Sequence, residues 1–177
     1  LMAITVIDLS KATTTPSGWT SWFISTGSSG NGFQVFYKTS NGTETGFSAT
    51  TTSAWVAALY DFSGSRTVDT YNAPAPGTSL FVAAPTLTSP SSGAGVVCLF
   101  NFGWNSSNIL ASQTQLTSPD ASWVTNTFND GGGYQGNIFA FWTGKVGTNL
   151  LGYPNFLYLG TGVTALANSS AACFSLL

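Results

Sequence analysis

Apolar and polar residues alternate with a period of two along most of the chain, which is typical of half-buried β-strands. Phe33, Val35 and Tyr37 illustrate the pattern, because they fall on one face of a single extended segment. Gly, Pro, Asn and Ser separate such segments, and Asn41-Gly42 has the composition of a tight hairpin turn. We expect about ten strands, drawn from segments at 4–7, 19–25, 33–38, 43–51, 55–62, 66–71, 79–83, 94–104, 110–116, 123–128, 137–146 and 171–177.

Two segments are apolar at nearly every position, unlike the alternating ones. They read WVAALYDF from Trp55 to Phe62 and AGVVCLFNFGW from Ala94 to Trp104. Their β-branched and aromatic content favours strands buried on both faces over helices. Many short strands without amphipathic helices predict an all-β fold, either an antiparallel β-sandwich or a barrel.

The length of 177 residues fits a single domain, with a distinct segment at its beginning. Residues 1–18 form a predicted N-terminal arm and linker, and residues 19–177 form the predicted domain. The arm carries four apolar residues that it cannot bury by itself, Ile4, Val6, Ile7 and Leu9. Either it lies on its own sheet or it adds to a sheet edge of a neighbouring molecule, and we favour docking to the neighbour.

Charged residues make up only 6% of the chain, four basic and six acidic. Four cations provide no basic surface for nucleic acid and no polybasic membrane patch. No apolar run reaches the roughly 18 residues of a membrane helix. With 43% hydrophobic residues and a net charge of −2, the composition is not that of a disordered chain.

Candidate catalytic chemistry is sparse. The chain has no His, and Glu44 is its one glutamate, so a Ser–His or Cys–His nucleophile and the usual zinc site are excluded. The loop around Asp130 is rich in glycine but lacks the alternating ligands of a calcium loop. We therefore predict no enzymatic activity, no catalytic residues, no cofactor and no metal.

The two cysteines, Cys98 and Cys173, lie in apolar, strand-like runs. We predict that they are buried free thiols, which behave as small apolar residues. A disulfide between neighbouring strands is the alternative, and the sequence does not decide the pairing.

Six tryptophans provide candidate binding surfaces. Trp55 and Trp142 lie inside apolar segments and are expected in the core. Polar neighbours instead favour exposed aromatic contacts, including a sugar-stacking surface, at Trp19, Trp22, Trp104 and Trp123.

The scarcity of charge also bears on assembly. Soluble monomers usually carry many charged residues, and edge strands are usually protected by Lys. A subunit of a dense assembly needs fewer charged residues on its surface and edge strands, because its uncharged faces contact other protein. The composition therefore favours a structural, homo-oligomeric protein.

The chain resembles Ser/Thr/Gly-rich β-sandwich proteins of tailed-bacteriophage virions over about residues 30–177. The resemblance is carried by WVAALYDFSG (55–64), the polar Pro/Gly stretch to about Pro90, GVVCLF (95–100) and SAACFSL (170–176), whereas the stretch 150–159 departs from it. It implies a jelly-roll-like sandwich and a capsid decoration (cement), head-fibre or tail protein. The implied partners are other virion proteins such as the major capsid protein, and the implied location is the virion, assembled in the host cytoplasm.

Two other functions are kept as alternatives. One is a carbohydrate-binding module or adhesin with a glycan partner, and the other is a cell-surface filament subunit that donates its N-terminal strand; both imply an extracellular location. The sequence does not indicate the host, the part of the virion, the oligomer order or the copy number.

Overall fold

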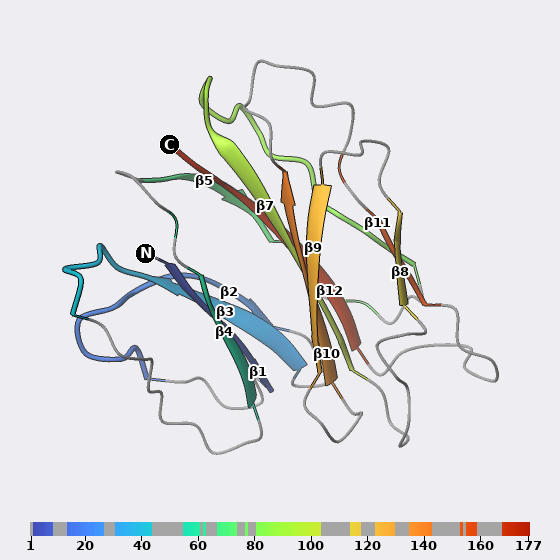
Figure 1. Ribbon diagram of the computed structural model, residues 1–177. Helices are drawn as coiled ribbons and strands as arrows, with labels where there is room; N and C mark the ends of the chain where they lie inside the picture. The colour runs from blue at the N-terminus through green and yellow to red at the C-terminus, as the bar shows by residue number, and fades with distance from the viewer. Residues whose placement is uncertain are drawn as a thin grey trace.

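A computed structural model describes residues 2–8, 14–26, 31–43, 55–60, 62, 67–73, 77, 81–103, 114–117, 123–129, 135–142, 153, 155–158 and 168–177. Within these ranges every regular element is a β-strand, which confirms the all-β prediction (Figure 1). The described part contains twelve strands: β1 Met2–Asp8, β2 Thr20–Thr26, β3 Asn31–Tyr37, β4 Trp55–Tyr60, β5 Val68–Asn72, β6 Phe81–Ala83, β7 Gly95–Gly103, β8 Thr114–Thr117, β9 Trp123–Asn129, β10 Gln135–Trp142, β11 Asn155–Tyr158 and β12 Asn168–Leu176.

The strands form antiparallel sheets of four, five and three strands. Their orders are β2-β3-β1-β4, β5-β12-β7-β10-β9 and β6-β11-β8. The five-stranded sheet lies between the other two, since β3 contacts β7 and β12 on one side and β6 contacts β12 on the other (Figure 1). The return strand expected at 43–51 falls almost entirely outside the described residues.

The neighbouring strands β7 and β12 form the centre of the molecule. They pair in continuous antiparallel register from Asn168 opposite Gly103 to Leu176 opposite Gly95. Every residue from Val96 to Phe100 and from Ser169 to Leu176 is buried. Successive strand residues point to opposite faces, so both faces of this pair are covered by other parts of the chain. Continuous burial explains why β7 is an apolar run rather than an alternating one, whereas β12 also buries the polar residues Ser169, Ser170 and Ser175.

One face of the β7–β12 pair, which we name the core face, carries the main hydrophobic cluster. Val97, Leu99, Ala172, Phe174 and Leu176 project from this face. They pack with Val35 of β3, and partly buried side chains of Trp22, Tyr37, Phe62, Val68 and Ala73 surround them. Burial of these side chains between two sheets removes apolar surface from water and stabilises their contact.

The opposite face, named the cover face, carries Val96, Cys98 and Phe100 of β7 and Cys173 and Ser175 of β12, all nearly or fully buried. No strand pairs along residues 84–94, yet Ala84, Leu87 and Ala94 of this irregular stretch are buried as well. Described contacts on this side come from the irregular stretch and from β6 of the three-stranded sheet, whereas β3 of the four-stranded sheet packs on the core face.

The N-terminal segment is paired within the chain's own sheet. Strand β1 lies between β3 and β4, with Ile4 opposite both Val35 and Ala58. Both hydrogen-bonding edges of β1 are thus occupied, whereas we expected an arm that docks on a neighbour. Donation of this strand to another copy stays a prediction about an assembly, which a single chain does not test.

Candidate functional site

A disulfide joins Cys98 of β7 to Cys173 of β12, at directly opposed positions of the ladder. Their Cα atoms are 4.1 Å apart, and neither residue is exposed to solvent. The prediction that both cysteines are buried is confirmed, but the prediction of free thiols is wrong. The sequence showed that each run was apolar, but not that strand register would put the two cysteines side by side.

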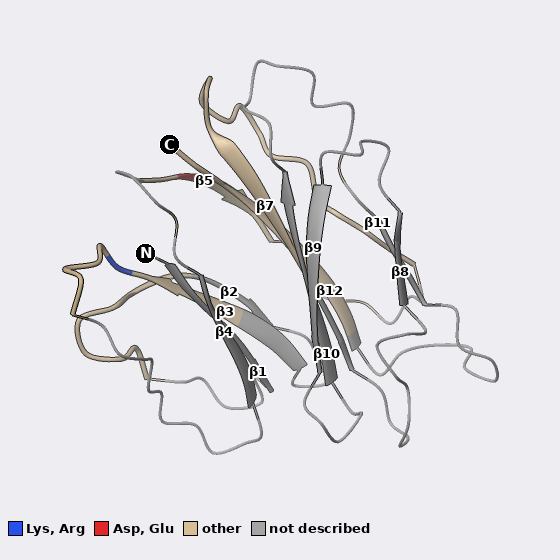
Figure 2. Cartoon of the chain, viewed as in Figure 1, with Lys and Arg blue, Asp and Glu red and all other residues tan. Residues whose placement is uncertain are grey.

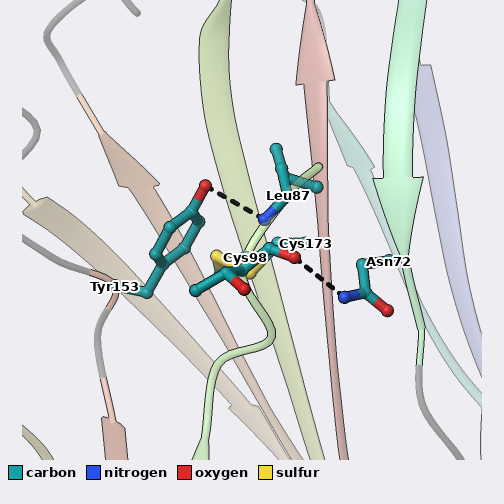
Figure 3. The surroundings of a disulfide bond; sticks show 6 residues. Asn72, Leu87, Cys98, Tyr153 and Cys173 are labelled. Atoms are coloured by element: carbon teal, nitrogen blue, oxygen red, sulfur yellow. Dashed lines mark hydrogen bonds between the residues drawn. A yellow bond between two sulfur atoms is a disulfide. The ribbon is translucent and has the colours of Figure 1, made fainter. Parts of the chain in front are cut away.

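The disulfide lies on the cover face, beside residues of the irregular stretch (Figure 3). Two side chains from elsewhere in the chain bind the backbone of that stretch. The Leu87 N–H donates to the Tyr153 hydroxyl at 3.1 Å, and Asn72 Nδ2 donates to the Thr86 carbonyl at 2.8 Å. Leu87 and Tyr153 both lie next to the cysteine pair (Figure 3).

A second polar cluster ties β5, β12 and the turn before β7 together. Asp69 accepts hydrogen bonds from the Ser91 N–H at 2.9 Å, the Ser91 hydroxyl at 2.8 Å and the Ser175 hydroxyl at 2.8 Å. Ser175 Oγ in turn accepts a 3.3 Å bond from the Thr70 N–H. These bonds, above all that of the Ser91 N–H, lower the pKa of Asp69, while partial burial acts in the opposite direction.

The hydrogen bonds of this cluster connect strands, and its hydroxyl groups are poorly placed to react with a substrate. Its serine hydroxyls donate to an aspartate that stays ionised, and Ser175 is fully buried, so a substrate could not reach it. Sequence reasoning missed this cluster because Asp69 is an isolated carboxylate in a short polar segment, and its serine partners lie 22 and 106 residues away.

An aromatic cluster lies where β2 and β3 meet β5 and β12. The Trp22 ring makes edge-on contacts with Tyr37, Tyr71 and Phe174, at centroid distances of 6.1, 5.8 and 4.9 Å. Nearby in sequence, the Lys38 ammonium lies 5.3 Å from the centre of the Trp19 ring. Tyr71 is 47% exposed, so the outer part of this cluster faces solvent.

The predicted contact residues are only partly brought together. Trp19 and Trp22 are both half-buried, so part of each side chain is exposed, and their role as contact residues stays a prediction. Trp104 and Leu9 lie outside the described residues, and the side chain of Trp123, at the start of β9, is not described either. Ile4, Val6 and Ile7 lie in β1, where their backbone pairs with β3 and β4.

Charge is as sparse in the structure as in the composition. Among residues whose side chains are described, the charged ones are Lys38, just after β3, and Asp69 in β5 (Figure 2). That part of the chain contains no group of three or more side chains suited to hold a metal ion. It also contains no helix long and apolar enough to cross a membrane.

Neither a protein-family model, nor a curated protein, nor a solved structure matches this chain.

Proposed function

We propose that the chain is a non-enzymatic structural protein of a virion, a decoration (cement) protein on the surface of a tailed-phage particle. One observation carries the proposal: a chain whose described regular elements are all strands, with a buried central strand pair, has only 6% charged residues to place on its outside. Such a surface suits contact with the major capsid protein and with further copies of the chain. On this proposal, the strands form a jelly-roll-like sandwich.

The disulfide fits the extracellular part of a phage life cycle. Disulfides persist in oxidising surroundings and are rare in a reducing cytoplasm. A particle that is assembled in the host cytoplasm and then released would pass from reducing to oxidising surroundings. On this proposal, the protein acts outside the cell as a component of the released virion.

The test is to ask which larger object contains the protein. Phage particles are purified by density gradient, and their proteins are identified and counted by mass spectrometry. We expect the chain in many copies per particle, with binding that changes by less than tenfold between low salt and about 1 M salt, since few charges are available for screening. Absence from purified particles would refute the proposal.

Carbohydrate binding is a second candidate, favoured by the aromatic cluster around Trp22. A partly exposed aromatic cluster with little charge is suited to stacking on neutral sugars. A glycan array tests it, with Tyr71→Ala as the variant. Phe81→Ala is the matched control, because Phe81 is 50% exposed, like Tyr71, but lies in β6. A sugar signal lost in Tyr71→Ala and kept in Phe81→Ala would favour this candidate over the virion protein.

A further inference from the structure

We propose that residues 84–90 form a lid over the Cys98–Cys173 disulfide, held closed by Asn72 and Tyr153, and that this lid controls the access of small thiols and disulfides to the cysteine pair. The proposal concerns the chemistry of the cysteine pair and does not depend on the proposed function.

The first argument is the direction from which a reagent can arrive. Cys98 and Cys173 alternate with Val97, Leu99, Ala172 and Phe174, which are packed against β3 on the core face. A reagent approaching from the core face would have to pass through that cluster. On the cover face the irregular stretch lies beside the cysteines, and moving it breaks no strand pairing among the described residues (Figure 3).

The second argument is how the stretch is held. An irregular segment has no strand ladder to satisfy its buried backbone groups, so turns, side chains or water have to do so. Asn72 and Tyr153 provide two such partners, at the adjacent residues Thr86 and Leu87. Leu87 is only 8% exposed and lies in the surroundings of the disulfide, so movement of this point would open the cover face beside the cysteines (Figure 3).

The third argument is the chemistry of thiol–disulfide exchange, which needs contact with a sulfur atom. With dithiothreitol as reductant, a reagent thiolate attacks one cysteine sulfur, the Cys98–Cys173 bond breaks, and the other cysteine leaves as a thiolate. The second reagent thiol then attacks the mixed disulfide, closes the reagent into a cyclic disulfide and releases the second cysteine. Two electrons pass from reagent to protein, and the two cysteines take up the two protons that the reagent loses. With both sulfurs unexposed, the first attack has to wait for an opening.

The experiment measures how fast dithiothreitol reduces the folded, oxidised protein, with released thiols trapped by iodoacetamide and counted by mass. Tyr153→Phe removes the acceptor for Leu87 and keeps the ring; Asn72→Ala removes the donor to Thr86. We expect each variant to be reduced about five- to tenfold faster, the equilibrium factor of one lost hydrogen bond, and the double variant faster still.

Ser21→Ala is the matched control. It removes the 2.8 Å hydrogen bond that Gln34 donates to Ser21 in the four-stranded sheet, away from the lid. Its reduction rate should stay within twofold of the parent. Unchanged rates in Tyr153→Phe and Asn72→Ala, or an equal increase in Ser21→Ala, would overturn the proposal.

A measurement on the unmodified protein keeps the test decisive if a variant fails to fold. Opening of a short lid exposes little surface, so the reduction rate should rise only weakly with urea below the unfolding transition. A slope equal to that of global unfolding would show that the disulfide is reached by unfolding the sheet, and would overturn the lid.

Discussion

The core face and the cover face of the β7–β12 pair are buried equally well but by different means. The core face packs on β3, a strand whose backbone groups are paired within its own sheet, so apolar side chains can make the contact without serving backbone groups. The cover face meets an irregular stretch. There, side chains bind backbone groups of Thr86, Leu87 and Ser91. Irregular chain that covers a sheet needs partners for its buried backbone groups, and here polar side chains provide several of them.

The largest effect is expected from the core face. Phe174→Ala removes a fully buried ring that contacts Trp22, and should lower the free energy of unfolding by about 3–5 kcal/mol through lost burial and the cavity left behind. Urea unfolding followed by fluorescence measures it. Phe81→Ala, at an exposed aromatic, should change stability by less than about 1 kcal/mol. Equal losses in both variants would contradict the assignment of the core.

Removal of the disulfide tests the covalent link on the cover face. The bond spans 75 residues of sequence, so the double variant Cys98→Ala, Cys173→Ala should lose about 2–4 kcal/mol, mainly because the unfolded chain gains freedom. The unfolding midpoint of this variant should match that of the parent protein under reducing conditions. An unchanged midpoint in the variant would show that the bond adds nothing to stability.

A smaller and pH-dependent effect is expected at Asp69. Because the folded state lowers the pKa of Asp69, its contribution is fully present above the ordinary aspartate pKa of about 4 and is lost as pH falls through the lower folded value. Asp69→Asn should therefore cost about 1 kcal/mol at pH 7 and progressively less towards pH 3. Unfolding of both proteins at several pH values provides the comparison.

Ser91→Ala serves as the control for Asp69, because it keeps the Ser91 N–H and removes only the hydroxyl. It should cost less than Asp69→Asn at neutral pH. A cost for Asp69→Asn that does not change with pH would contradict the role of the ionised carboxylate.

The smallest effect is expected at Ser170, where substitution should not reduce stability as it does at the other positions. Ser170 lies on the core side of β12, is buried, and its hydroxyl has no hydrogen-bond partner in the described structure. Ser170→Ala removes an unsatisfied polar group from an apolar setting, so it should leave stability unchanged or raise it by up to about 1 kcal/mol. Thermal unfolding is sufficient to detect the sign. A clear loss of stability would mean that the hydroxyl is satisfied after all.

Sequence reasoning was most successful where burial is continuous. The apolar run 94–104 was predicted as a buried strand, and the structure has β7 at Gly95–Gly103 in the middle of a sheet. The apolar run 55–62 was predicted as a central strand, but β4 at Trp55–Tyr60 is the last strand in the order of the four-stranded sheet. The segment 171–177 was likewise predicted as a strand, though β12 begins earlier, at Asn168. The sequence pattern did not indicate this start of β12, because Ser169 and Ser170 are polar. Their burial depends on the neighbouring β7 and not on their own hydrophobicity.

The candidate sites were predicted less well. Trp22 was singled out as an exposed contact, but its ring packs on Phe174 at the border of the core. Asp69, Asn72 and Tyr153 were not singled out, since each is an ordinary polar residue in its local sequence. Their partners lie 14 to 106 residues away, and only the folded chain brings them together.

The sequence by itself predicted strands and no amphipathic helix, from period-two alternation and frequent turn residues, and in the described part of the chain every regular element is a strand. It also determined that Cys98 and Cys173 are buried, since both lie in apolar runs. Only the tertiary structure decided that they form a disulfide, because pairing depends on the register of β7 against β12. The same holds for β1, whose apolar pattern fits its own sheet or a neighbour's, and which the fold places between β3 and β4.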